Sequence, residues 1–213
     1  MRLYLSSFRL GNRPQRMLDL LRGGTRAAVV GNADDYKDAD LRATSVEREM
    51  NDLRGLGLTP VEVDLRHYFD RPDALRSVLD SVDLIWVRGG NPFILRRAMT
   101  LTGADEILRD LLAEDRVVYA GYSAGICVLT PSLHGLELVD DPHDVPAGYP
   151  EEIVWDCLGL LPYSILPHHR SDHPESALID KSLEYMVDHH MPFVALRDGQ
   201  ALVIDGDDQE VAG

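Results

Sequence analysis

The segment Val117–Leu129, VVYAGYSAGICVL, is an apolar run that contains a lone serine between two glycines. Its centre, Gly121–Gly125, has the pattern G-x-S-x-G, which forms a nucleophile elbow where a strand precedes the serine and a helix follows it. The apolar residues around Ser123 predict both elements. The sharp turn would push the Ser123 hydroxyl beyond the sheet, and the N–H of Ala124 would face a developing oxyanion. A glycine-rich turn that only packs tightly is the alternative interpretation.

Short β-like runs and amphipathic helical patterns alternate around this segment. Such alternation is typical of βαβ units and predicts a mostly parallel sheet. The predicted strands are Leu3–Leu5, Arg26–Val30, Pro60–Val63, Leu84–Val87 and Val117–Ala120, and the predicted helices are Pro14–Leu21, Ser45–Leu53, Ala74–Leu79 and Ala104–Leu112. We therefore expect one α/β domain that spans residues 1–213.

The last third of the chain has a different pattern. Residues 140–150 are rich in Pro, Gly and Asp and predict an irregular loop. After it we expect a strand at Tyr163–Leu166, a helix at Glu175–His189, and a hairpin over Phe193–Ile204.

Composition limits the classes of partner and the compartment. The chain has 213 residues and a formal net charge of −15, so its surface repels phosphate backbones and anionic membranes. Its two cysteines form no C-x-x-C pair, and no apolar stretch is long enough for a signal sequence or a membrane span. We expect a cytoplasmic protein that binds neither nucleic acid nor membranes.

A serine hydroxyl needs a base, and the segment Leu166–Pro174, LPHHRSDHP, is the richest source of histidine. His168 directly follows a predicted strand, and reactive groups gather at the carboxyl ends of strands in open α/β sheets. The same segment allows zinc ligation by His168, His169, Asp172 and His173, but no H-E-x-x-H or further cysteine motif supports a metal site. We expect neither a metal ion nor a cofactor.

Two further stretches are candidates for supporting roles. Asp198 lies between two apolar runs, where it either orients a catalytic histidine or simply forms an Asp-Gly hairpin turn. Val87–Phe93, VRGGNPF, follows a strand and opens a helix, so its backbone N–H groups are candidates for a second oxyanion donor. Its alternative role is a turn with Asn91 as the helix N-cap.

Four motifs in this order resemble the serine peptidase family of aspartyl dipeptidases and cyanophycinases. They are VRGGNPFILRRAM (87–99), YAGYSAGICVL (119–129), LGLLPYSILPHH (158–169) and ALRDGQALVI (195–204). The resemblance covers most of the chain. It implies a three-layer fold similar to the class I glutamine amidotransferase domain, flavodoxin-like, with helices on both faces of a mostly parallel sheet.

The resemblance also implies the roles of individual residues. Ser123 matches the nucleophile, His168 the base and Asp198 the acid, with Gly90 or Gly89 and Ala124 as oxyanion donors. Three departures stand out. Aspartate replaces the family's usual glutamate at position 198, Arg88 stands where the aspartyl dipeptidases have a glycine, and the chain ends soon after Ile204, where the family often continues with more strand.

The expected activity is hydrolysis of peptide bonds in short peptides through an acyl-enzyme, with an N-terminal Asp as one substrate option. Arg88 or Arg170 would bind an acidic side chain, and Gly89 and Asn91 are further candidates for substrate contacts. The order Ser, His, acid argues against the common α/β-hydrolases. Open alternatives are a hydrolase of β-aspartyl or isopeptide bonds and a ligand-binding module without catalysis. The resemblance also suggests a homodimer.

Overall fold

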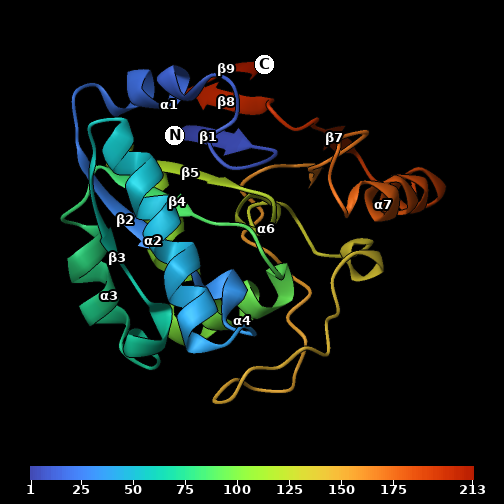
Figure 1. Ribbon diagram of the computed structural model, residues 1–213, viewed down its shortest axis with the longest axis horizontal. Helices are drawn as coiled ribbons and strands as arrows, with labels where there is room; N and C mark the ends of the chain where they lie inside the picture. Colours follow the sequence, from blue (N-terminus) through green and yellow to red (C-terminus); the bar gives the residue numbers. More distant parts are fainter.

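A computed structural model describes residues 1–213. A seven-stranded sheet forms its centre (Figure 1). The strand order is β3-β2-β4-β5-β1-β8-β9. The strands are β1 (Arg2–Ser6), β2 (Arg26–Val30), β3 (Thr59–Glu62), β4 (Leu84–Val87), β5 (Val118–Tyr122), β8 (Ala201–Asp205) and β9 (Asp208–Ala212). The first five are parallel, whereas β8 and β9 are antiparallel to their neighbours.

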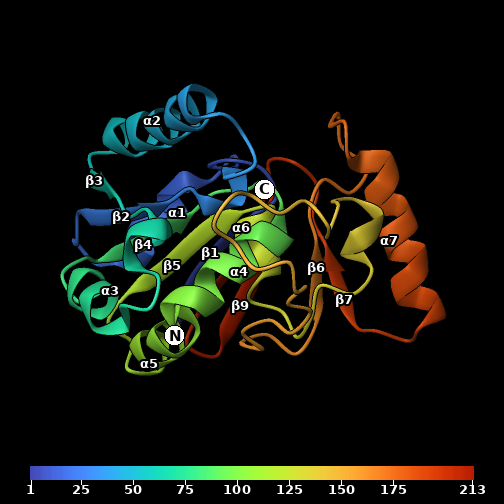
Figure 2. The same ribbon diagram turned by 90° about the horizontal axis from the view of Figure 1, so that it is seen from below.

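Helices cover both faces of this sheet (Figure 2). On one face, α1 (Pro14–Leu21) and α2 (Ala39–Gly55) pack on a smaller apolar cluster that includes Tyr4 and Trp86. On the other, α3 (Pro72–Leu79), α4 (Pro92–Thr102), α5 (Ala104–Ala113) and the short α6 (Ala124–Cys127) pack on a larger one. Successive residues of β1 face opposite clusters, because strand side chains alternate. The predicted three layers are confirmed. None of the helices is both long and apolar enough to cross a membrane.

A second, two-stranded parallel sheet lies beside the main one. It consists of β6 (Ser164–Leu166) and β7 (Phe193–Ala195), which α7 (Ser176–Asp188) connects. The predicted hairpin over Phe193–Ile204 is therefore wrong, since β7 pairs with β6 and β8 pairs with β1. Strand β8 is buried on both faces, with Leu202 in the larger cluster and Val203 in the smaller. A position inside the main sheet buries the apolar side chains on both faces of β8, whereas a two-stranded hairpin would leave them exposed.

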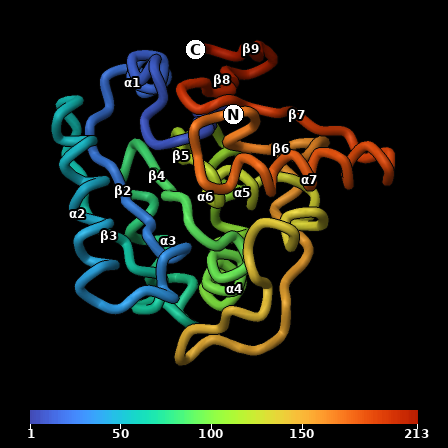
Figure 3. Tube along the Cα trace, turned by 45° about the vertical axis from the view of Figure 1, so that its right-hand side comes forward, coloured from blue at the N-terminus to red at the C-terminus, as the bar shows by residue number.

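A long irregular segment precedes β6 and runs past α4 (Figure 3). The predicted loop at residues 140–150 lies in this segment and contains no helix or strand. The fully buried Arg97 of α4 holds it, because its guanidinium donates to the carbonyl oxygens of Pro142 (2.8 Å) and Glu152 (3.0 Å).

The turn from β5 into α6 packs closely against the end of β4. Strand β5 pairs in parallel with β4, so that Gly121 lies opposite Val87. A Cβ atom on Gly121 would lie 2.3 Å from the Val87 carbonyl oxygen, and one on Gly125 would lie 2.2 Å from the same atom. Only glycine fits at either position without a shift of the backbone.

We expect Gly125→Ala to lower the free energy of unfolding by about 1–3 kcal/mol, the usual cost of overpacking. Gly55→Ala is the matched control, because Gly55 is exposed in α2 with no atom near its would-be Cβ. Urea denaturation of both variants measures the difference. Equal stability of Gly125→Ala and wild type would refute the close approach.

Candidate active site

Ser123 occupies the sharp turn between β5 and α6. Its φ of 49° and ψ of −120° lie in a region that residues with a side chain rarely adopt. The two glycines that pack against Val87 keep the turn tight, and so the Ser123 side chain faces a cavity of about 220 Å³. The turn therefore has the geometry of a nucleophile elbow.

His168 follows β6 after Pro167 and lines the same cavity as Ser123. The side chain is only 1% exposed, and its Nδ1 atom lies 2.7 Å from Oδ1 of Asp198. Asp198 comes from the turn between β7 and β8, where Gly199 adopts a φ of +93°. The shorter aspartate thus reaches the imidazole directly, without a bridging water.

Two serine hydroxyls hold this pair in place. The Ser7 hydroxyl, just after β1, donates to Asp198 Oδ1 (2.8 Å) and accepts from the backbone N–H of His168 (2.8 Å). The Ser171 hydroxyl accepts from the backbone N–H of Asp198 (2.8 Å). Three segments far apart in the sequence are therefore tied at one point. Such a network fixes the imidazole orientation, as catalytic histidines require.

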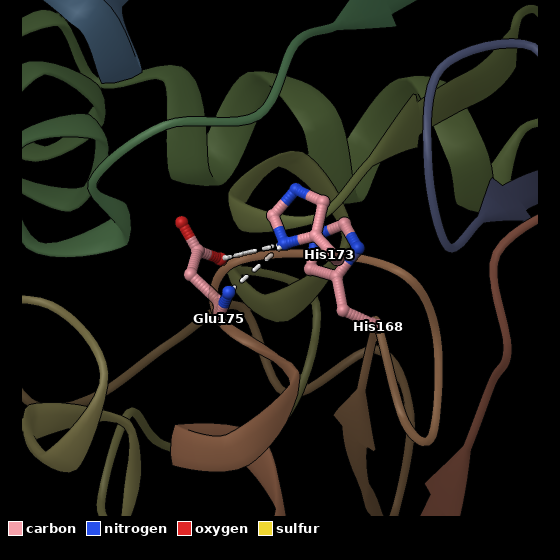
Figure 4. A group of neighbouring side chains, drawn as sticks. All are labelled: His168, His173 and Glu175. Carbon is pink, nitrogen blue, oxygen red and sulfur yellow. Dashed lines mark hydrogen bonds and ion pairs between the residues drawn. The ribbon is translucent and has the colours of Figure 1, made fainter.

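Two further polar side chains, His173 and Glu175, lie beside the His168 ring (Figure 4). The His173 ring stacks on the His168 ring at a centroid distance of 3.7 Å, and Glu175 Oε2 lies 3.9 Å from His168 Nε2. Ser123 Oγ makes no hydrogen bond to His168 in this arrangement. Catalytic hydrogen bonds are often long before substrate binds.

The ionisation of His168 suits a base. Burial lowers the pKa of its imidazole below the usual 6.5, and the carboxylate of Asp198 only partly offsets this. The ring is therefore neutral at pH 7. With Nδ1–H donated to Asp198, the lone pair lies on Nε2, inside the cavity.

The loop between β4 and α4 supplies backbone N–H groups beside Ser123. A Cβ on Gly89 would lie 2.9 Å from the Ser123 Cβ, so the loop packs directly against the serine. Gly90 has a φ of +139°, and a side chain there would meet the Ala33 carbonyl oxygen at 2.5 Å. The N–H groups of Gly90 and Ala124 donate to no other backbone or side-chain acceptor. They are free to bind an oxyanion.

The other predicted contact residues differ in their positions. Arg88 lines the cavity, but it is buried and paired with Asp34 and, at 3.5 Å, with Glu49. Asn91 caps α4: its side chain accepts from Phe93 N and donates to the Asp141 carbonyl. Arg170 is exposed and does not line the cavity. Neither Asn91 nor Arg170 therefore presents a free polar group to Ser123.

Two cations that sequence reasoning missed line the same cavity, namely Lys37 and Arg48. Lys37 Nζ lies 2.9 Å from Asp34 Oδ2, and Arg48 lies 3.2 Å from Glu49. The sequence could have indicated Lys37, because its loop follows the carboxyl end of β2, and ligands bind at the carboxyl ends of strands in open α/β sheets. Arg48 lies inside α2 among other charged residues and had no such signal.

A narrow apolar recess on the other side of Ser123 contains a second carboxylate near Glu175. It is lined in part by Cys127, Leu136 and Asp140. Burial, reinforced by the charge of Glu175, raises the pKa of Asp140 to about 8. Asp140 therefore holds its proton more strongly than an exposed aspartate does, and Glu175 lines the same recess.

Comparison with known proteins yields one family and several relatives. Residues 13–212 match Peptidase family S51. A probable alpha-aspartyl dipeptidase from Drosophila melanogaster is 30% identical over 143 residues, which are 65% of this chain and 55% of that protein. A peptidase E from Streptomyces coelicolor is 30% identical over 166 residues, 76% of this chain and 64% of the relative. The chain thus spans between about half and two thirds of these curated relatives.

Solved structures share the fold over nearly the whole chain. A protein from Listeria monocytogenes EGD-e that is described as a peptidase E has a TM-score of 0.79 at 21% sequence identity. The match covers 99% of this chain and 97% of the Listeria chain. A peptidase from an acI-B1 actinobacterium has a TM-score of 0.68 at 15% identity, covering 100% of this chain and 87% of that one. The predicted α/β fold, similar to the class I glutamine amidotransferase domain, is confirmed. Since the family match runs from residue 13 to 212, the protein belongs to peptidase family S51, as its four sequence motifs predicted.

Proposed function

We propose that this protein is a serine peptidase that cleaves short peptides through an acyl-enzyme, with Ser123, His168 and Asp198 as its triad. The observation that carries the proposal is the direct His168–Asp198 contact at 2.7 Å beside a serine on a strained turn in the same cavity. Membership of family S51 supports the reaction class. The names of the relatives, peptidase E and alpha-aspartyl dipeptidase, support peptide substrates.

The proposed reaction follows from the positions of these groups. His168 Nε2 accepts the Ser123 proton as Oγ attacks the scissile carbonyl carbon. The Gly90 and Ala124 N–H groups bind the oxyanion of the tetrahedral intermediate. His168 then protonates the leaving amine, and water, activated by the same nitrogen, releases the acyl group. Asp198 holds the Nδ1–H tautomer and stabilises the imidazolium that forms.

Substrate size and charge follow from the cavity. Its volume of about 220 Å³ suits one or two residues of a peptide. Three cations, Lys37, Arg48 and Arg88, line it together with two carboxylates, Asp34 and Glu175. Because Arg88 is buried in its ion pairs, Lys37 and the half-exposed Arg48 are the groups that reach an acidic side chain. A preference for N-terminal Asp is therefore part of the proposal.

Ser123→Ala is expected to abolish turnover of a dipeptide panel, by about 10⁶-fold for a triad serine. Wild type is expected to react with a fluorophosphonate probe at Ser123, located by peptide mass spectrometry. Ser81→Ala is the control, because Ser81 lies on the surface after α3. Full activity of Ser123→Ala would refute the triad, whereas tight peptide binding without any turnover by wild type would favour a binding module.

The pH profile tests His168. Since its pKa is lowered and only the neutral ring is a base, kcat/KM is expected to fall as pH decreases through a value below 6.5. Asp198→Asn removes the interaction that raises the pKa of His168, so the pH at which kcat/KM falls on the acid side is expected to be lower still. The same variant is expected to lower kcat by up to about 10⁴-fold. An acid limb above pH 6.5 in wild type would contradict the proposed base.

Lys37→Met and Arg48→Met test the preference for an acidic residue. Each is expected to lower kcat/KM for Asp-Leu about tenfold relative to Ala-Leu, because one charge-assisted contact is lost. Lys181→Met is the matched control, since Lys181 is the only other lysine and lies exposed on α7. An unchanged ratio of the two substrates in both variants would remove these cations from substrate recognition.

A further inference from the structure

His168, His173 and Glu175 form a cluster whose donor atoms are those of a transition-metal site. One nitrogen of each ring and one carboxylate oxygen lie within 4.8 Å of one another (Figure 4). Two imidazoles and a carboxylate are a ligand set that binds Zn²⁺ and leaves a further position open. All three residues also line the cavity that contains Ser123, so an ion has access to them.

The separations are close to those that a bound ion requires. Glu175 Oε2 lies 3.9 Å from His168 Nε2 and 4.0 Å from His173 Nδ1. An ion equidistant from three such atoms would lie roughly 2.5 Å from each, against Zn–N and Zn–O bonds of about 2.0–2.2 Å. The radial mismatch is thus a few tenths of an ångström at each ligand, and the two imidazole nitrogens must also turn toward a common point to close the site.

His168 is already prepared as a ligand by its contact with Asp198. Histidines that bind metals commonly donate their second ring N–H to a carboxylate, which fixes the tautomer and raises the basicity of the ligating nitrogen. The Nδ1 contact to Asp198 at 2.7 Å has this arrangement and leaves Nε2 toward Glu175.

The ring stack is the larger of the two changes that binding requires. The two imidazoles lie face to face with an interplanar angle of 6°, so their in-plane lone pairs do not converge. His168 is fixed by Asp198, whereas the His173 side chain is 17% exposed and makes only a long hydrogen bond, 3.3 Å, from the Glu175 N–H. Rotation of His173 out of the stack brings its nitrogen toward the shared position.

Contrary to the expectation from the sequence, we infer that His168, His173 and Glu175 bind one divalent transition cation of the zinc type, and that the ion inhibits the enzyme rather than assisting it. The inhibition rests on the proposed function. The lone pair of His168 Nε2 that would take the Ser123 proton is the same pair that binds the ion, so the two events exclude each other. The negative net charge of −15 favours cation approach.

Titration calorimetry with ZnCl₂ on chelator-treated protein tests the site directly, together with the visible spectrum of the Co²⁺ form. We expect one ion per chain and the absorption of a low-coordinate Co²⁺ site with nitrogen ligands. His173→Ala and Glu175→Gln are expected to weaken binding at least about tenfold, and Asp198→Asn by about 10–100-fold as a supporting partner. His189→Ala is the control, since its exposed ring lies at the end of α7.

The outcomes separate the site from the proposed reaction. Ser123→Ala is expected to bind Zn²⁺ like wild type, so binding is decided even if no peptide is ever cleaved. Absence of stoichiometric binding, or equal affinity in His173→Ala, Glu175→Gln and wild type, would overturn the site. The Glu175 side chain is half-exposed, so Glu175→Gln is expected to fold even if His173→Ala does not, and it then tests the site alone. Turnover that is unchanged or increased by saturating Zn²⁺ would overturn the inhibition.

Discussion

The contact of the Val87 carbonyl oxygen with two glycines is the constraint on which the site depends. Gly121 and Gly125 lie so close to this oxygen that no side chain fits at either position. Their approach bends the chain sharply enough to hold Ser123 at a positive φ, with its hydroxyl beyond the sheet. Because Val87 ends β4, the same contact places the Gly89–Gly90 loop beside the serine. One backbone contact therefore brings Ser123 and the Gly89–Gly90 loop together, which are the nucleophile and an oxyanion donor of the proposed reaction.

The sheet register completes the site from segments that are far apart in the sequence. Ser6 lies opposite Tyr122 in the parallel pair β1–β5 and opposite Ala201 in the antiparallel pair β1–β8. The carboxyl ends of β1 and β5 and the amino end of β8 thus meet at one edge. Ser7 follows β1 and Asp198 precedes β8, so their hydrogen bond is a consequence of this register. The register, rather than any single loop, brings Asp198 to His168.

Much of the fold was predictable, because strands buried on both faces and glycines at tight turns leave strong local patterns. The five parallel strands and the roles suggested for Ser123 and His168 came from such patterns and from motif order. The partner of β7 was not predictable, since strand pairing is a long-range property that the Asp-Gly turn did not encode. Arg48 and Glu175 were missed for a related reason: each lies in or next to an ordinary polar helix, and only the packed chain brings them to Ser123.

The position of β8 inside the sheet also bears on when the protein can become active. Ser123 and the glycine loop belong to segments that leave the ribosome well before residues 193–205. Asp198 reaches His168 only after β8 has paired with β1. A nascent chain therefore contains Ser123 through the last part of synthesis before Asp198 can contact His168, so the proposed triad is complete only when the sheet is complete.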